Sequence, residues 1–296
     1  MSNKKPIIVT GTHRSGTTWV GQMIALDKNV RYIHEPFNID EPRIHPLKFW
    51  FEYISFDDPE ERQKEIYEFI DEILDFNLKG VSKDFKKING PRDILRFIKD
   101  TYERINKRPL LKDPIAVMSA DWIAKKFNAD VVALIRHPAS FIASIKVKDW
   151  EHFFHHFIEQ EKLMNLLGPY ADKIRKYSEL HPDIIDQGIL LWNIIYYRIS
   201  QYQKAHPEWM FIRHEDLSLD PVNEYKKIYE KLGLNFTSKV ENKIIDSTSS
   251  KKAEHLKRDS KKNILTWKNR LSEEEIKRIK KDTQEVSSQF YGENDW

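Results

Sequence analysis

Short apolar runs alternate with amphipathic stretches along most of the chain. The runs at 7–10 and 131–135 are rich in valine and isoleucine and have the length of buried parallel strands. Shorter runs at 30–33, 110–111 and 209–212 are further candidate strands. Residues with helical periodicity follow most of these runs, so the pattern predicts an α/β fold with a central parallel sheet and helices on both faces.

The stretch from about 45 to 107 is charged, has a helical period and separates the second candidate strand from the third. Pro59 and Pro91 each precede a repeat of apolar residues, and proline is common in the first turn of a helix. We therefore expect a helical insertion that lies over the active site. No repeat or low-complexity segment interrupts the chain, so residues 1–296 are expected to form a single domain.

Two helices near the end of the chain also have clear signals. Residues 184–204 form a long aromatic pattern with helical period. Ser272 and Glu275 have the spacing of a capping box, in which each side chain accepts a hydrogen bond from the other residue's backbone N–H. We expect a helix to begin directly after Ser272.

The segment 10–18 follows the first candidate strand and contains two glycines with the spacing of a nucleotide-phosphate loop. Gly11 and Gly16 match the Walker pattern GxxxxGK[ST], but Thr17 stands where that pattern has its lysine. The nearest positive charge is Arg14. Hydroxyl groups and backbone N–H groups at a helix N-terminus bind anions; the hydroxyls here belong to Ser15, Thr17 and Thr18. The segment predicts a P-loop NTPase-like three-layer fold and a nucleotide without γ-phosphate chemistry.

A second candidate anion site follows the strand at 131–135. Arg136 stands at the end of that strand, where an arginine is either a surface charge or a fork directed at a ligand oxyanion. Ser144 lies eight residues later, in the next predicted helix. Together with the loop at 10–18, this pair implies a nucleotide that is phosphorylated at two separate positions.

Both motifs resemble those of sulfotransferases that use 3′-phosphoadenosine 5′-phosphosulfate (PAPS). The segment 11–19 is similar to the family's 5′-phosphosulfate loop, and 135–144 is similar to its 3′-phosphate motif. The segments 212–221 and 260–268 resemble the family's acidic turn and its basic nucleotide lid. The resemblance implies PAPS as donor, 3′,5′-bisphosphoadenosine (PAP) as leaving product and no metal. It assigns nucleotide contacts to Arg14, Ser15, Gly16, Thr17, Thr18, Trp19, Arg136, Ser144, Lys261, Lys262 and Trp267.

Sulfuryl transfer to a hydroxyl needs a base in line with the sulfur and opposite the leaving phosphate. Glu35, at the end of the strand at 30–33, is our first candidate; His34 is the second and Asp113 the third. Lys112 and Arg14 are expected to stabilise the transferring group. Family members that act on phenols and steroids carry a histidine after a Lys-Thr motif, which 112–114 lacks. Glu35 is instead typical of the carbohydrate and tyrosyl-protein branches.

An aromatic and histidine-rich stretch at 150–159 is predicted to be a helix that lines the acceptor cleft. Its histidines at 152 and 156 have i, i+4 spacing, with Glu159 nearby, but the pattern differs from HExxH and is a weak metal signal. We expect His34, His152 and His155 to contact the acceptor. A small molecule or an oligosaccharide is the expected acceptor class, with carbohydrate preferred and a protein tyrosine, a lipid or a small alcohol left open.

Composition narrows the remaining possibilities. The chain has 49 basic and 46 acidic residues, a net charge of +3 and no cysteine, which excludes disulfides and thiolate chemistry and gives no case for nucleic acid. Without a signal peptide or a membrane-span pattern, we expect a cytoplasmic enzyme. The sequence does not indicate the oligomeric state. The alternatives are a P-loop nucleotide kinase or NTPase and a non-catalytic anion-binding module.

Overall fold

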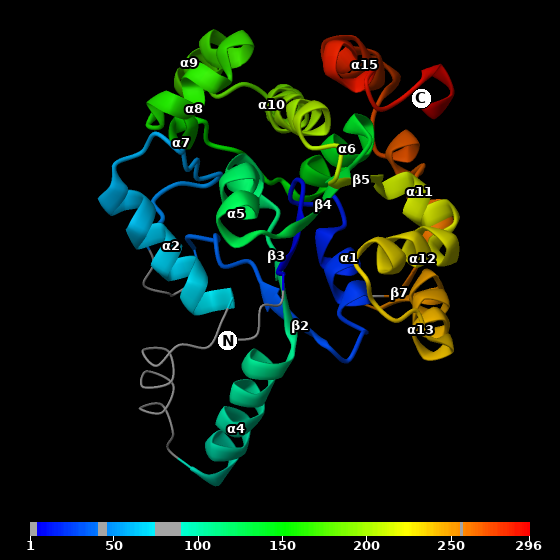
Figure 1. Cartoon of the computed structure of the whole chain (residues 1–296). Coiled ribbons are helices and arrows are strands. Elements are labelled where there is room, and N and C mark those ends of the chain that lie inside the picture. Colours follow the sequence, from blue (N-terminus) through cyan, green and yellow to red (C-terminus); the bar gives the residue numbers. More distant parts are fainter. Residues whose placement is uncertain (1–4, 41–45, 75–89, 255–256) are drawn as a thin grey trace.

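The computed structural model describes residues 5–40, 46–74, 90–254 and 257–296, and a five-stranded parallel sheet forms its centre (Figure 1). The strands lie in the order β2-β3-β1-β4-β5. Their bounds are β1 (Ile7–Thr10), β2 (Val30–His34), β3 (Arg108–Lys112), β4 (Asp130–Ile135) and β5 (Met210–Arg213). The predicted strands and the parallel sheet are confirmed.

The strand order puts β1 in the middle of the sheet. Ile8 on β1 lies beside Leu111 on β3 and Val131 on β4. All five strands run in the same direction, so the segments that follow β1, β2, β3 and β4 meet at one edge, the usual ligand edge of such a sheet.

Alternate residues of the strands pack into two hydrophobic clusters. Ile7 and Val9 belong to a cluster with α1 (Thr17–Ile24) and α12 (Pro221–Lys231). Ile8 belongs to the other cluster, which contains α6 (Pro138–Lys148) and α10 (Ile184–Ala205). Because successive side chains of a strand point to opposite faces, helices cover both sides of the sheet, as predicted.

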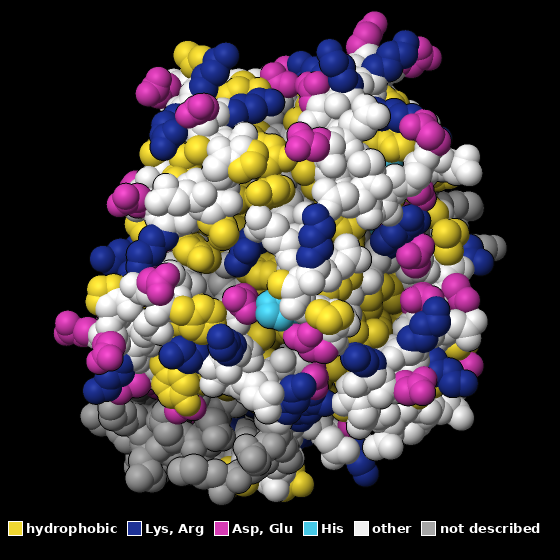
Figure 2. Space-filling model, turned by 45° about the horizontal axis from the view of Figure 1, so that its top comes forward, with side chains coloured by type: hydrophobic (Ala, Val, Ile, Leu, Met, Phe, Trp, Pro, Cys, Tyr) yellow, Lys and Arg dark blue, Asp and Glu magenta, His cyan; other side chains and the backbone are white. Residues whose placement is uncertain are grey.

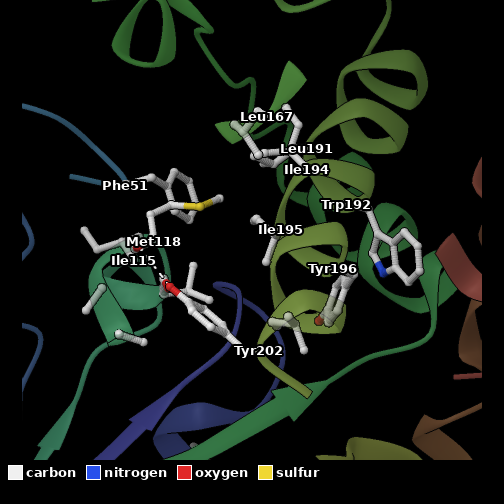
Figure 3. Packing of buried hydrophobic residues seen from close by; sticks show 14 of the residues in the cluster. Phe51, Ile115, Met118, Leu167, Leu191, Trp192, Ile194, Ile195, Tyr196 and Tyr202 are labelled. Atoms are coloured by element: carbon white, nitrogen blue, oxygen red, sulfur yellow. Dashed lines mark hydrogen bonds between the residues drawn. The ribbon is translucent and has the colours of Figure 1, made fainter. Parts of the chain in front are cut away.

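The long helix α10 organises the larger cluster, as Figure 3 shows for its buried side chains. Its predicted length and aromatic character are confirmed. The Tyr202 hydroxyl lies 3.0 Å from the carbonyl oxygens of both Val117 and Met118. These carbonyls belong to the 3-10 helix η1 (Ile115–Ser119). Only residues 113–114 separate this helix from the end of β3. The core thereby holds the segment that leaves β3 at the ligand edge.

The two described helices of the insertion differ in how much of their surface is buried. α2 (Glu60–Leu74) buries Ile66, Ile70 and Leu74. α4 (Pro91–Asn106) buries no residue, and Figure 1 shows that it extends away from the sheet. It leads into the amino end of β3, opposite the ligand edge, so the expectation that the insertion lies over the active site is wrong for α4. A local apolar period predicts a helix but not the surface on which it packs.

The remaining elements complete the covering layers. They are α5 (Ala120–Phe127), α7 (His155–Ile158), α8 (Glu161–Leu166), η2 (Gly168–Tyr170), α9 (Ala171–Leu180), α11 (His214–Leu219), α13 (Ser238–Thr248), β6 (Ser249–Glu254), β7 (Lys257–Asp259), α14 (Ser260–Asn263), η3 (Thr266–Asn269), α15 (Glu273–Ser287) and η4 (Glu293–Asp295). The capping box of Ser272 and Glu275 is present at the start of α15. Among the described residues, no helix combines the length and apolar character of a membrane span.

Candidate active site

The loop between β1 and α1 is a tight turn that depends on its two glycines. Gly11 has φ +151°, and a Cβ atom there would lie 2.7 Å from the Leu134 carbonyl oxygen. Gly16 has φ +95°, and a Cβ atom there would lie 2.6 Å from the His214 Nδ1 atom. Ser15 closes the turn, because its backbone N–H and its hydroxyl both donate to the Thr12 carbonyl, at 3.1 and 2.6 Å. Both glycines are therefore required by the backbone path.

Gly16→Ala should destabilise the protein by about 1–3 kcal/mol, because alanine at this φ is strained and its methyl group meets the ring of His214. It should also weaken nucleotide binding, since the backbone N–H groups of the loop shift. Gly168→Ala is the control, because a Cβ atom there meets nothing within 4 Å. Thermal melts of both variants check the prediction. Equal melting temperatures for the two would contradict it.

The other loop residues lie where a helix N-terminus begins. Thr17 is buried and Thr18 is half-buried, both in the first turn of α1. The Trp19 indole N–H donates to the Ser247 hydroxyl at 3.1 Å, and the ring makes an edge contact with Tyr225. Trp19 therefore packs α1 against α12 and α13.

The two motifs that the sequence assigned to separate phosphates are joined in the structure. Arg14 Nε donates to the Ser144 hydroxyl at 2.9 Å, and the Arg136 guanidinium donates to the backbone carbonyl of Arg14. Burial lowers the pKa of Arg136 to about 10, so this guanidinium keeps its charge at neutral pH. Two arginines and a serine thus form one positively charged site at the ligand edge of the sheet.

Two buried aromatic residues of α10 fix the backbone of Arg136. Its N–H donates to the Tyr196 hydroxyl at 3.0 Å, and the Trp192 indole N–H donates to its carbonyl at 2.9 Å. In the sequence both residues are only part of the long aromatic helical pattern at 184–204. Their contact with Arg136 depends on the packing of α10 and could not be inferred from spacing.

Glu35 and Lys112 form an ion pair at the ends of β2 and β3. Lys112 Nζ donates to Glu35 Oε1; the lysine is fully buried, whereas 26% of the Glu35 side chain is exposed. Burial lowers the pKa of Lys112, and its hydrogen bond to Glu35 opposes this effect. His34 Nε2 lies 3.9 Å from Glu35 Oε2 on the exposed side. The carboxylate is therefore accessible from outside and held by a buried cation from behind.

Asp113 is fully buried beside this pair. Its carboxylate oxygens accept the backbone N–H groups of Phe37 at 2.7 Å and Ile115 at 3.1 Å. Burial raises its pKa to about 7, an effect that these two hydrogen bonds partly oppose. Asp113 has no exposed surface, whereas 26% of the Glu35 side chain is exposed, so Glu35 is better placed than Asp113 to take a proton from an incoming hydroxyl.

Comparison with known proteins identifies the family. A family model described as "Sulfotransferase family" matches residues 6–238, well over half of the chain. This chain belongs to the sulfotransferase family. The family resemblance inferred from the sequence is thereby confirmed, and with it the prediction of an enzyme of this class. No curated protein sequence matches the chain.

Solved sulfotransferase structures share the fold of this sulfotransferase at low sequence identity. The sulfotransferase domain from the curacin biosynthetic pathway is 17% identical, with a TM-score of 0.52 and coverage of 97% of both chains. A mouse sulfotransferase complexed with PAP is 15% identical, with a TM-score of 0.50 and coverage of 96% of this chain and 85% of that one. The sulfotransferase domain of the Synechococcus olefin synthase is 14% identical, with a TM-score of 0.50 and coverage of 99% and 98%. These similarities confirm the α/β fold.

The histidine-rich stretch of the sulfotransferase differs from its predicted form. Only His155–Ile158 is helical, because Asp149 adopts φ +48° after α6 and the His152 N–H donates to the Gln187 side chain. The predicted helix over 150–159 is therefore wrong. The ring of His152 packs edge-on against Phe51, Phe154 and Phe157, and burial lowers its pKa to about 3.

The three histidines that were expected to contact the acceptor lie in different surroundings, and the same stretch carried the weak metal signal. His34 and His155 are exposed, whereas the His152 ring lies among core aromatic side chains. Within the described ranges, no cluster of three His, Asp or Glu side chains is placed to hold a metal ion. Trp150 contacts the loop at 10–18, where its ring centroid lies 5.0 Å from that of His13.

The segment 260–268, which resembles the family's nucleotide lid in sequence, is only partly described. Lys261 is exposed, and the side chain of Lys262 lies outside the described part of the structure. Trp267 is buried and stacks on His137 with ring centroids 5.3 Å apart. His137 follows Arg136 directly, and its backbone N–H donates to the buried Glu215 at 3.1 Å. Trp267 thus supports the Arg136 turn.

The surface and the cavities add context to the site. Figure 2 shows acidic and basic side chains interspersed on the face that it presents, which does not favour a polyanion-binding surface there. Two cavities of about 440 and 490 Å³ lie beside β5 and at the amino edge of the sheet. Neither is lined by the loop at 10–18.

Proposed function

We propose that this sulfotransferase moves the sulfuryl group of PAPS to a hydroxyl acceptor, preferably on a carbohydrate, with Glu35 as general base. One observation carries the proposal. The loop after β1 and the Arg136–Ser144 motif form a single site, linked through Arg14, at the ligand edge that also presents Glu35 and Lys112.

The donor fits the positive groups of this site. The loop N–H groups and the hydroxyls of Thr17 and Thr18 bind the 5′-phosphosulfate, and Arg136 with Ser144 binds the 3′-phosphate. The mouse sulfotransferase with a similar fold is complexed with PAP, which supports this choice of nucleotide. A triphosphate lacks its usual partner here because Thr17 replaces the Walker lysine.

In the proposed reaction the acceptor oxygen attacks sulfur in line with the bond to the leaving phosphate. Glu35 takes the hydroxyl proton, a new S–O bond forms and the bond between sulfur and the phosphate oxygen breaks. Arg14 and Lys112 stabilise the negative charge that collects on the sulfuryl oxygens and on departing PAP. Lys112 also holds the Glu35 carboxylate in place through their ion pair.

The acceptor side of Glu35 is lined by polar groups. His34 is exposed, and its Nδ1 atom lies 3.2 Å from the Tyr32 hydroxyl, so its Nε2 atom is directed by this contact. A sugar hydroxyl network can bond to the imidazole and to Glu35 Oε2, the oxygen on the exposed side of the carboxylate. This arrangement supports carbohydrate, and His34 as an acceptor contact, over an aliphatic alcohol.

Transfer from PAPS labelled in its sulfuryl group tests the proposal. The panel contains methyl glycosides, a glucosamine disaccharide, a tyrosine peptide, p-nitrophenol, octanol and water alone. We expect the disaccharide to accept label fastest, without added divalent metal. Label on octanol or the peptide in preference to all sugars would overturn the acceptor class, and no PAPS turnover with any acceptor would overturn the function.

A further inference from the structure

The turn that carries Glu35 is attached to the end of β3 by two backbone groups. The Glu35 N–H donates to the Lys112 carbonyl at 2.9 Å, which continues the pairing of β2 with β3 by one residue. Two residues later, the Phe37 N–H donates to Asp113 Oδ2 at 2.7 Å. Residues 112 and 113 therefore contact both the side chain and the backbone of the segment 35–37.

This turn has an unfavourable backbone conformation. Glu35 has φ +37°, which a residue with a side chain adopts at a cost of about 1–3 kcal/mol. The turn closes by a hydrogen bond from the Asn38 N–H to the Glu35 carbonyl at 3.2 Å. Such a conformation persists only where surrounding contacts impose it, and the Asp113 carboxylate supplies the contact at Phe37.

We propose that Asp113 is a positioning residue for sulfuryl transfer, which holds the turn at 35–37 so that the Glu35 carboxylate faces the acceptor. The inference rests on the proposed role of Glu35 as the base. Asp113 is itself anchored on both sides, because its N–H donates to the Val9 carbonyl at 2.9 Å and its Oδ1 atom accepts the Ile115 N–H. It therefore ties the base to the strand that precedes the nucleotide loop.

Only an ionised aspartate satisfies both backbone donors at this position. Asparagine offers one acceptor oxygen and would direct its amide N–H₂ group toward a second N–H donor. Asp113→Asn should therefore release one end of the link with little change in volume. Loss of the Phe37 bond would free the turn directly, and loss of the Ile115 bond would loosen Asp113 itself, so in either case Glu35 should lose its alignment while the nucleotide loop keeps its structure.

The link should also depend on pH. Burial raises the pKa of Asp113 to about 7, and the charged or titratable groups that face it are Glu35, Lys112 and Tyr32. Glu35 favours the protonated form and Lys112 the ionised form. When pH falls through about 7, Asp113 takes up a proton and one of its oxygens becomes a donor. Its hydrogen bonds to the N–H groups of Phe37 and Ile115 then weaken. Turnover should fall on the acid side of neutrality.

The chain contains a matched control in Asp27. It is buried, its Oδ1 atom accepts the Asn29 N–H at 2.8 Å and its Oδ2 atom accepts the Asn235 N–H at 2.9 Å. This arrangement copies that of Asp113, with one donor two residues ahead and one distant, but it lies at the amino edge of the sheet. Asp27→Asn reports what losing such a link does to the fold alone.

The experiment measures kcat, KM, PAP affinity and melting temperature for both variants, with the fastest acceptor of the panel. We expect Asp113→Asn to lower kcat by about 10²-fold, to keep PAP affinity and to lose the acid limb near pH 7. Asp27→Asn should keep the wild-type kcat and pH profile. Equal kcat and pH profiles for the two variants would overturn the proposal. The pH profile of the wild-type enzyme is a test that does not depend on any variant. A flat wild-type kcat between pH 6 and 8 would also overturn the proposal.

A double variant separates this proposal from the function on which it depends. If Asp113 acts through Glu35, Glu35→Gln with Asp113→Asn should lose no more activity than Glu35→Gln alone. Multiplied losses would show that Asp113 acts elsewhere and contradict its positioning role. Wild-type turnover in Glu35→Gln would instead refute the base and, with it, both claims.

Discussion

Glu35→Gln should lower kcat by about 10²–10⁴-fold, the usual contribution of a general base, while PAP still binds with wild-type affinity. Glutamine keeps the shape of the side chain but cannot accept the acceptor's proton. The nucleotide site consists of other residues, so its affinity should not change. Single-turnover transfer from labelled PAPS and calorimetry with PAP measure the two effects separately.

His34→Gln is the matched control for this prediction. His34 lies 3.9 Å from the same carboxylate and is the alternative base. If Glu35 is the base, His34→Gln should raise KM for the acceptor and leave kcat within about threefold of the wild type. The reverse result, with kcat lost in His34→Gln and kept in Glu35→Gln, would assign the proton transfer to His34.

Arg136→Ala should weaken PAP binding by about 10²-fold, since charge-assisted hydrogen bonds to a phosphate are among the strongest in proteins. The substitution also removes the donor to the Arg14 carbonyl, so the loop loses a support. Removal of the 3′-phosphate from the ligand should lower the affinity of the wild type by a similar factor. It should lower the affinity of the Arg136→Ala variant little further. Calorimetry with PAP and with 5′-AMP completes this cycle.

Arg92→Ala provides the control for charge. Arg92 is exposed on α4, away from the ligand edge, and its removal changes the net charge by the same amount. We expect wild-type PAP affinity for this variant. Equal effects of the two substitutions would mean that Arg136 contributes only to the overall potential and contacts no phosphate.

The parts of the fold that follow from local pattern were predictable from the sequence. The apolar runs at 7–10 and 131–135 became the central strands because a buried parallel strand needs such residues on both faces. The loop glycines were recognisable because their positive φ and the close approach of Leu134 and His214 exclude a side chain.

Contacts between distant segments could not be read from the sequence. The hydrogen bond from Arg14 to Ser144 joins residues 130 positions apart. The hydrogen bond from the Arg136 N–H to the Tyr196 hydroxyl depends on how α10 crosses the core. Asp113 was visible only as a third candidate base. Its actual partners, the N–H groups of Phe37 and Ile115, are backbone atoms, which leave no signature in a sequence.

Two errors have a common cause. The stretch at 150–159 and helix α4 both show apolar residues at helical spacing, but this spacing does not indicate where a segment packs. In the first, the left-handed Asp149 and the Gln187 side chain interrupt the helix. In the second, the helix forms, but its apolar residues Ile94, Leu95 and Ile98 remain exposed. Tertiary packing decides both outcomes.

Calorimetry of the wild-type protein with PAP and with ATP and Mg²⁺ tests the central claim most directly. If the loop at 10–18 and the Arg136–Ser144 motif form one site for a nucleotide with separate 5′ and 3′ phosphates, PAP should bind without metal. It should also bind at least about 10²-fold more tightly than ATP with Mg²⁺. Tighter, magnesium-dependent binding of ATP would contradict the account and indicate a kinase or NTPase.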